Sequence, residues 1–199
     1  MIRVGPRLLA PRERRPGCPT RPRGPSDSPR PHRLHSRAPE LGLAAIVRIA
    51  SDRDIDCLTS LILVFRDHQG RELPTENQLR SFLVRRLLPD KHTRFFIAAD
   101  SGADCIGYVQ QRYRFSLWTQ GPQADIEDLF VMPAARRQGV GASLIQFAIE
   151  QARSFGCPQI SVDTNERNVE AMGLYEKLGF SARSPRWSGG RRTLLRQRL

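Results

Sequence analysis

Residues 136–141, Arg136-Arg137-Gln138-Gly139-Val140-Gly141, have the types and spacing of a phosphate-binding loop. The loop follows an apolar run at residues 125–131 and leads directly into a segment with helical periodicity. Glycines at a strand-to-helix turn let backbone N–H groups approach a ligand without an intervening side chain. The first turn of the helix adds unpaired N–H donors and the positive end of its dipole. These features predict an anion site whose natural ligand is a pyrophosphate.

Two other kinds of phosphate loop fit this sequence less well. A Walker loop requires Gly-Lys followed by Ser or Thr, whereas Gly141 is followed by Ala142 and Ser143. A dinucleotide-binding loop requires a third glycine where this chain has Leu144. A glycine-bearing turn that binds nothing stays open as the alternative, because short motifs also occur by chance.

Hydrophobic periodicity places the loop within a succession of strands and helices. Strands are predicted at residues 46–49, 94–99, 105–117, 125–131, 160–162, 180–183 and 193–198. Helices are predicted from a cap at Asp52 or Asp54, from Thr75 to about residue 88, and over residues 139–155 and 168–178. Thr75 and Gln78 have the spacing of a capping box. The order of elements predicts an α/β fold in which helices flank a mixed sheet.

Residues 1–40 differ in composition from the rest of the chain. They hold nine of the fifteen prolines, ten arginines and only three acidic residues, and so carry +7 of the formal net charge of +12. Closely spaced prolines break helices, and the segment has little apolar surface to bury. We therefore expect a disordered Arg/Pro-rich extension at 1–40 and one domain at 41–199.

Several interpretations of the extension stay open. As a basic arm it would neutralise phosphates, but no aromatic residues are interleaved with the arginines, so we do not expect a nucleic acid partner. As a transit peptide it would be suitably rich in arginine, but its prolines oppose the usual amphipathic helix. The extension could also be dispensable, or it could precede a true start near Val47.

The cysteines and histidines give no sign of a metal site. Cys18, Cys57, Cys105 and Cys157 lie far apart without a C-x-x-C pair, which favours ordinary buried thiols in a reduced, cytoplasmic protein. The four histidines do not cluster with them, so we expect no metal. No apolar stretch is long enough to span a membrane, and there is no apolar signal-peptide core, so we expect no membrane partner.

Three blocks of sequence occur together in an order and spacing typical of one family. They are Ile126-Glu127-Asp128-Leu129-Phe130-Val131-Met132-Pro133, the loop at 136–141, and Asn168-x-x-Ala171-x-x-Leu174-Tyr175-Glu176-Lys177-x-Gly179-Phe180. This set resembles the GNAT superfamily of N-acetyltransferases, and the first block resembles diamine (spermidine/spermine) acetyltransferases in particular. The resemblance covers about residues 125–180 and implies a largely antiparallel, splayed sheet.

The resemblance implies acetyl-CoA as the cosubstrate. In the family, loop amides hold the pyrophosphate of coenzyme A; the corresponding residues are Arg136, Arg137, Gln138, Gly139, Val140, Gly141 and Ala142. The pantetheine arm pairs like an added strand with the strand before the loop, here at Leu129, Phe130 and Val131. Asn168 and Tyr175 are expected to contact the cofactor as well. Arg137 stands where relatives often have glycine.

Acetyl transfer to an amine requires removal of an ammonium proton, stabilisation of an oxyanion and protonation of the departing thiolate. By resemblance, Glu127 is the expected base, Tyr175 the expected acid and a backbone N–H near Leu129 or Phe130 the expected oxyanion donor. Glu127 could instead be a strand-edge glutamate without a catalytic role, and Tyr175 could be a core residue on the apolar face of its helix. Asp128 is expected on the opposite face of the strand from Glu127, unless a bulge intervenes.

The leading hypothesis is transfer of an acetyl group from acetyl-CoA to a primary amine of a small molecule by direct attack in a ternary complex. The acceptor would be a polyamine, an amino acid or an amino sugar. A protein N-terminus or lysine is the alternative acceptor, and a non-catalytic acyl-CoA sensor is the alternative of another class. Residues 113–123 are expected to border the acceptor groove, and Gly173 to mark close approach of another group. A homodimer stays open.

Overall fold

The computed structural model describes residues 45–183, together with residues 188 and 197. The predicted extension at 1–40 and nearly all of the predicted strand at 193–198 lie outside the described residues. In the described part, the strands form a sheet in the order β1-β2-β3-β4-β5. They are β1 (Ile46–Ile49), β2 (Thr93–Ala99), β3 (Cys105–Ser116), β4 (Gly121–Val131) and β5 (Ile160–Val162). Neighbouring strands are antiparallel, except for the parallel pair β4 and β5.

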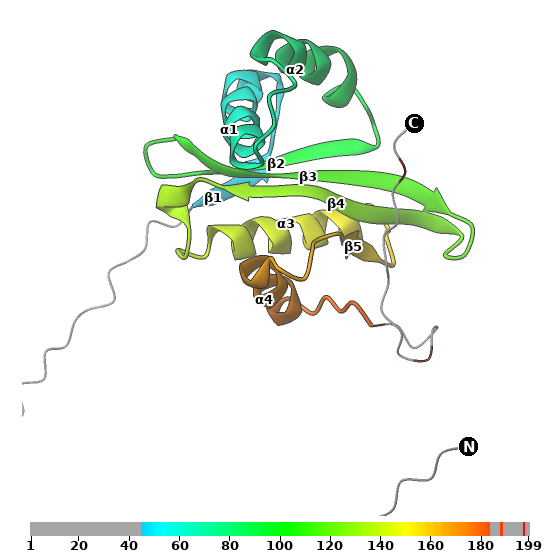
Figure 1. Cartoon of the computed structure of the whole chain (residues 1–199). Helices are drawn as coiled ribbons and strands as arrows, with labels where there is room; N and C mark the ends of the chain where they lie inside the picture. The colour runs from blue at the N-terminus through cyan, green and yellow to red at the C-terminus, as the bar shows by residue number, and fades with distance from the viewer. Residues whose placement is uncertain (1–44, 184–187, 189–196, 198–199) are drawn as a thin grey trace, which may run out of the picture. The chain divides into compact units, whose positions relative to one another are not determined.

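Helices lie on both faces of this sheet, with α1 and α2 on one side and α3 and α4 on the other (Figure 1). They are α1 (Ile55–His68), α2 (Glu76–Phe82), α3 (Val140–Ser154) and α4 (Val169–Lys177). None of the helices in the described part is long and apolar enough to cross a membrane. A mixed, largely antiparallel sheet flanked by helices confirms the predicted fold class.

The interior strand β2 is buried on both faces, because helices cover both. Phe96 belongs to the core beneath α3, together with Leu144. On the other face, Ile97 packs in a second core with Leu58 of α1. Burying each large apolar side chain contributes roughly 1.5–3 kcal/mol. The two cores hold α1 against one face of the sheet and α3 against the other.

Polar side chains form hydrogen bonds at the beginning of both helices on the first face, but only α2 has a side-chain cap. The Gln78 amide donates to Thr75 Oγ1 at 3.4 Å, and the Thr75 amide donates to Gln78 Oε1 at 3.0 Å, which confirms the capping box at α2. Asp54 precedes α1 but does not cap it. Its carboxylate accepts two hydrogen bonds from Arg48, at 2.7 and 2.8 Å, and further ones from Ser51. The hydrogen bonds from Arg48 are the main reason that the pKa of Asp54 falls to about 2.

Several predicted boundaries are wrong. The helix predicted from Thr75 to about residue 88 has the expected extent, but its α-helical part ends at Phe82 and its last part is a π-helical turn at Leu83–Leu87. β4 begins at Gly121 rather than at residue 125, because residues 121–124 pair with β3 although Gly-Pro-Gln-Ala has no strand-like alternation in sequence. No strand forms at residues 180–183, where only Arg183 makes an isolated bridge.

Cys57 and Cys105 form a disulfide, which contradicts the expectation of ordinary thiols at these positions. The residues are 48 positions apart in sequence, but the packing of α1 against β3 brings their Cα atoms to 6.0 Å. That distance is usual for disulfides. Sequence spacing could not reveal the pair, because the contact is made by tertiary packing. Cys157 is a free, buried thiol.

Candidate active site

β4 and β5 separate after a short parallel pairing. Residues 124–126 of β4 pair with residues 160–162 of β5, and β5 then ends while β4 continues to Val131. Beyond Ile126, the side of β4 that faced β5 therefore has no strand partner in the described part of the chain. An unpaired strand edge can accept an extended ligand through main-chain hydrogen bonds. The predicted cofactor residues Leu129, Phe130 and Val131 lie on this edge.

A large open groove extends from this edge to the loop and along α4. Most of the residues predicted to bind the cofactor line it, namely Leu129, Phe130, Val131, Arg136, Arg137, Gly139, Gly141, Ala142, Asn168 and Tyr175. Two predicted residues do not. Gln138 donates from Nε2 to the Ala134 carbonyl at 3.0 Å, and the side chain of Val140 is part of the core.

The loop presents unpaired backbone N–H groups at the beginning of α3. Gly139 is the residue before the helix and has a φ of 85°, in the left-handed region that favours glycine. Arg137 also has a positive φ, 63°, at the position where glycine was expected from the resemblance. The N–H groups of residues 137–142 donate no hydrogen bond within the described part of the chain. This arrangement can hold an anion.

Arg136 differs from the other loop residues. Its amide donates to the Pro133 carbonyl at 3.3 Å, and its side-chain Nε donates to the Val131 carbonyl at 3.1 Å. The guanidinium carbon also lies 6.0 Å from the centre of the Phe130 ring. Arg136 therefore fastens the loop to the end of β4, and its amide is already used.

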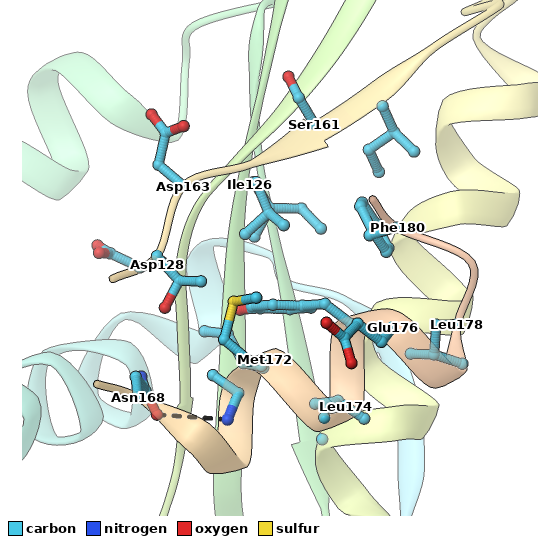
Figure 2. A pocket seen from close by; sticks show the side chains of 18 of the residues that line it. Ile126, Asp128, Ser161, Asp163, Asn168, Met172, Leu174, Glu176, Leu178 and Phe180 are labelled. Carbon is cyan, nitrogen blue, oxygen red and sulfur yellow. Dashed lines mark hydrogen bonds between the residues drawn. The ribbon is translucent and has the colours of Figure 1, made fainter. Parts of the chain in front are cut away.

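The loop approaches α4 closely. A β-carbon at Gly141 would lie 3.4 Å from Leu174 Cδ2, and Arg137 forms an ion pair with Glu170 at 3.6 Å. Asn168 caps α4 by accepting a hydrogen bond from the Ala171 amide at 3.3 Å (Figure 2). By contrast, a β-carbon at Gly173 would meet no atom within 4 Å, so the expected close approach there is wrong.

Tyr175 lies on α4 between the core and the groove. Only 7% of its surface is exposed, and its ring packs edge-on against Phe180 with 5.7 Å between centres. Burial raises the pKa of Tyr175 to about 12. At neutral pH the hydroxyl is therefore protonated and able to donate. Tyr175 is therefore a core residue, as one interpretation of the sequence expected, and it also lines the groove.

A β-bulge interrupts β4 at Glu127. Asp128 pairs with Gln110 of β3, but the next pair is Ile126 with Gln111, so Glu127 is an extra residue. Residues that pair directly lie on the same face of a sheet, which places Asp128 on the face of Gln110. The Glu127 carboxylate accepts a hydrogen bond from Gln110 Nε2 at 3.0 Å. Both carboxylates are therefore on one face, and the expectation of opposite faces is wrong because it assumed a regular strand.

The two carboxylates have different surroundings. Glu127 is 40% exposed in its side chain and forms an ion pair with Arg112 at 3.1 Å. Asp128 makes no side-chain hydrogen bond or ion pair within the described residues. Burial raises the pKa of Asp128, the charge of Glu127 raises it further, and the charge of Arg71 opposes the shift. The sequence pattern did not predict a role for Asp128. The only signal was that a bulge would bring it to the same face as Glu127.

Residues 113–123 form the far end of the β3–β4 hairpin. The groove is bordered there by Arg114, Ser116, Trp118, Thr119 and Gln123. Phe115 and Leu117 are among the most exposed apolar side chains in the described part. No group of three or more potential metal ligands occurs among the described residues.

Comparisons with known proteins agree with this geometry. The sequence model of the acetyltransferase (GNAT) family matches residues 59–180. Thialysine N-epsilon-acetyltransferase of Mus musculus is 32% identical over 104 residues, which are 52% of this chain and 57% of that protein, so the chain spans little more than half of this relative. Aminoglycoside N(6')-acetyltransferase type 1 of Acinetobacter baumannii is 26% identical over 138 residues, covering 68% of this chain and 89% of that protein.

A solved structure has the same fold. It is an aminoglycoside N-acetyltransferase in complex with CoA, and it aligns with a TM-score of 0.61 over 78% of this chain and 95% of the other. At 21% sequence identity, this likeness concerns the fold alone.

Proposed function

Because the chain belongs to the GNAT family of acetyltransferases, we propose that it transfers the acetyl group of acetyl-CoA to a primary amine of a small molecule. The observation that carries this proposal is the opening between β4 and β5. It exposes the strand edge at residues 129–131 beside a loop whose amides at 137–142 are unpaired. Relatives named for thialysine and for aminoglycosides support a small amine as the acceptor.

Coenzyme A would be held mainly by the backbone. The amides of residues 137–142 and the dipole of α3 bind the pyrophosphate, and Arg136 keeps the loop in place through the Val131 carbonyl. The edge of β4 at Leu129 and Phe130 binds the pantetheine arm as an added strand. Because the backbone would bind the pyrophosphate, the side chains of Gln138 and Val140 need not line the groove; one donates to the Ala134 carbonyl and the other packs in the core.

Tyr175 serves as the acid for the departing thiolate. It lines the groove from α4, and its raised pKa keeps the hydroxyl protonated at neutral pH. A proton donor with a pKa well above that of a thiol gives up its proton only as negative charge develops on the sulfur. An amide N–H on β4 near Leu129 serves as the oxyanion donor.

Removal of the amine proton is assigned to Asp128, with Glu127 as its partner. Asp128 accepts no hydrogen bond from another described residue, and burial raises its pKa, both of which suit a general base. Glu127, the base expected from the resemblance, shares its carboxylate with Arg112 and Gln110. Its charge keeps Asp128 basic, and the two carboxylates together attract a cationic acceptor.

Thiol release from acetyl-CoA, measured against a panel of acceptors, tests the proposed function. The panel contains diamines, amino acids, amino sugars, and peptides with a free N-terminus or a lysine. We expect release with at least one class of small amine and little with the peptides. Preference for peptides would favour a protein acceptor. Binding of coenzyme A, measured by calorimetry, without release in any reaction would favour a non-catalytic sensor.

A further inference from the structure

A charged hollow adjoins the groove at the place where β4 and β5 separate. Its volume is about 550 Å³, within the usual range for sites that bind small molecules. Its charged side chains come from the neighbouring strands β3 and β4 and from the residue that follows β5, namely Arg112, Arg114, Asp125, Glu127 and Asp163. Glu127, Ser161 and Asp163 line both the hollow and the groove, so the two are continuous.

Most charges in the hollow are neutralised by partners within it. Arg112 pairs with Glu127 at 3.1 Å, and Arg114 pairs with Asp125 at 2.5 Å. Asp125 also accepts a hydrogen bond from the Ser161 hydroxyl. Both arginines and two of the three carboxylates are therefore already paired, which leaves one negative charge unmatched.

The unmatched charge is Asp163, directly after the end of β5. It forms no hydrogen bond or ion pair with another described residue, although its charge, after that of Asp125, helps to raise the pKa of Arg114. Asp163, just after the end of β5, and Asp128 of β4 both line the groove, and Figure 2 shows them at the same side of the view with their carboxylates turned in different directions. A ligand that reaches Asp128 in the groove can therefore extend toward Asp163.

We infer that the hollow binds a second cationic group of the acceptor and that Asp163 is the carboxylate that receives it. The acceptor class is then a diamine or polyamine, with one amine at Asp128 and another ammonium group at Asp163. An ammonium group supplies three donors and a positive charge, and Asp163 offers unpaired acceptor oxygens beside a polar wall. The inference deepens the proposed function and rests on it.

The test compares a diamine with the monoamine of the same chain length as acceptors for the full chain. Asp163→Asn keeps the size of the side chain but removes its charge. We expect kcat/KM for the diamine to fall about tenfold, mainly through KM, as for a lost charge-assisted hydrogen bond. The same variant should leave kcat/KM for the monoamine and the KM for acetyl-CoA unchanged. Asp163→Glu should restore most of the loss.

Glu150→Gln on the exposed face of α3 is the matched control, and it should change none of these values. Equal losses of kcat/KM for the two amines in Asp163→Asn, or no loss for the diamine, would overturn the inference and leave the proposed function standing. If wild type acetylated neither amine, the proposed function would fail for this class. Calorimetry of the diamine with the coenzyme A-bound protein would then decide, because unaltered binding in Asp163→Asn contradicts the inference and weakened binding supports it.

Discussion

Gln110 on β3 lies directly opposite Asp128 on β4, one residue out of register with the neighbouring pair Gln111 and Ile126. The shift makes Glu127 a bulged residue and brings two carboxylates to the same face of the sheet. Bulges redirect side chains and often occur next to active sites. Here the bulge has an electrostatic consequence, because the charge of Glu127 helps to raise the pKa of Asp128.

Replacing the two carboxylates separately should give different results. Asp128→Asn removes the assigned base, and we expect kcat/KM to fall about 100-fold, in the range for loss of a general base. Glu127→Gln should cost less than about tenfold, because it removes only a neighbouring charge. Initial rates with one amine, at saturating acetyl-CoA, measure both effects. A larger loss in Glu127→Gln than in Asp128→Asn would return the role of base to Glu127.

The acid side of the pH–rate profile should move in the Glu127→Gln variant. The base must be deprotonated to act, so the rate rises as pH passes through the pKa of Asp128. The negative charge of Glu127 raises that pKa, and its removal lowers it toward the ordinary value. We therefore expect the acid limb to shift to lower pH. A shift to higher pH, or no shift, would contradict the proposed coupling of the two carboxylates.

Tyr175→Phe should lower turnover without weakening coenzyme A binding. The variant retains the ring that packs against Phe180 and loses only the hydroxyl, so we expect kcat to fall about 10- to 100-fold. Tyr108→Phe is the matched control, because burial also raises the pKa of that hydroxyl, which makes no hydrogen bond within the described residues and lines neither the groove nor the hollow. Full turnover in Tyr175→Phe, or equal losses in the two variants, would rule out the proposed acid.

Gly139→Ala should weaken coenzyme A binding. The left-handed conformation costs an L-residue roughly 1–2 kcal/mol, and the backbone amides would turn away from the anion. Gly156→Ala, just after α3, is a control with the same strain, since its φ is 84° and open space also surrounds its β-carbon position. Calorimetry should show weaker binding in the first variant alone, with similar losses of stability in both. Equal affinities would argue against the loop as the pyrophosphate site.

Reduction of the disulfide should destabilise the protein. Cys57 and Cys105 close a loop between α1 and β3, and such a link typically contributes about 2–4 kcal/mol. Thermal unfolding with and without a thiol reductant measures the effect. The double variant Cys57→Ser, Cys105→Ser should melt at a low temperature that the reductant does not change. A wild-type midpoint that is insensitive to complete reduction would contradict this expectation.

The sequence predicted the features that depend on local chemistry. Gly139 was expected where the backbone must turn into α3, and the structure gives it a positive φ. Thr75 and Gln78 were expected to form a capping box, and they do. Each of these signals lies within a few residues, where backbone conformation and a short side-chain contact determine the outcome.

Features that depend on packing could not be predicted in the same way. The Cys57–Cys105 pair requires α1 to lie on β3, and the amide of Arg136 is used because η3 (Pro133–Ala135) brings a carbonyl beside it. The bulge at Glu127 depends on the pairing of β4 with β3, because alternation along β4 alone assigns Glu127 and Asp128 to opposite faces. Asp128 therefore became a candidate base only once the register was known.

Transfer of a labelled acetyl group from acetyl-CoA to an amine is the direct test of the proposed activity. Acetyl-CoA with a radiolabelled acetyl group is incubated with the full chain and a small primary amine, and the products are separated. We predict that label appears in the amide product, that this requires both the protein and the amine, and that Tyr175→Phe slows it. Label that remained in acetyl-CoA with every amine, or appeared only as free acetate, would contradict the proposed acetyl transfer to a small amine.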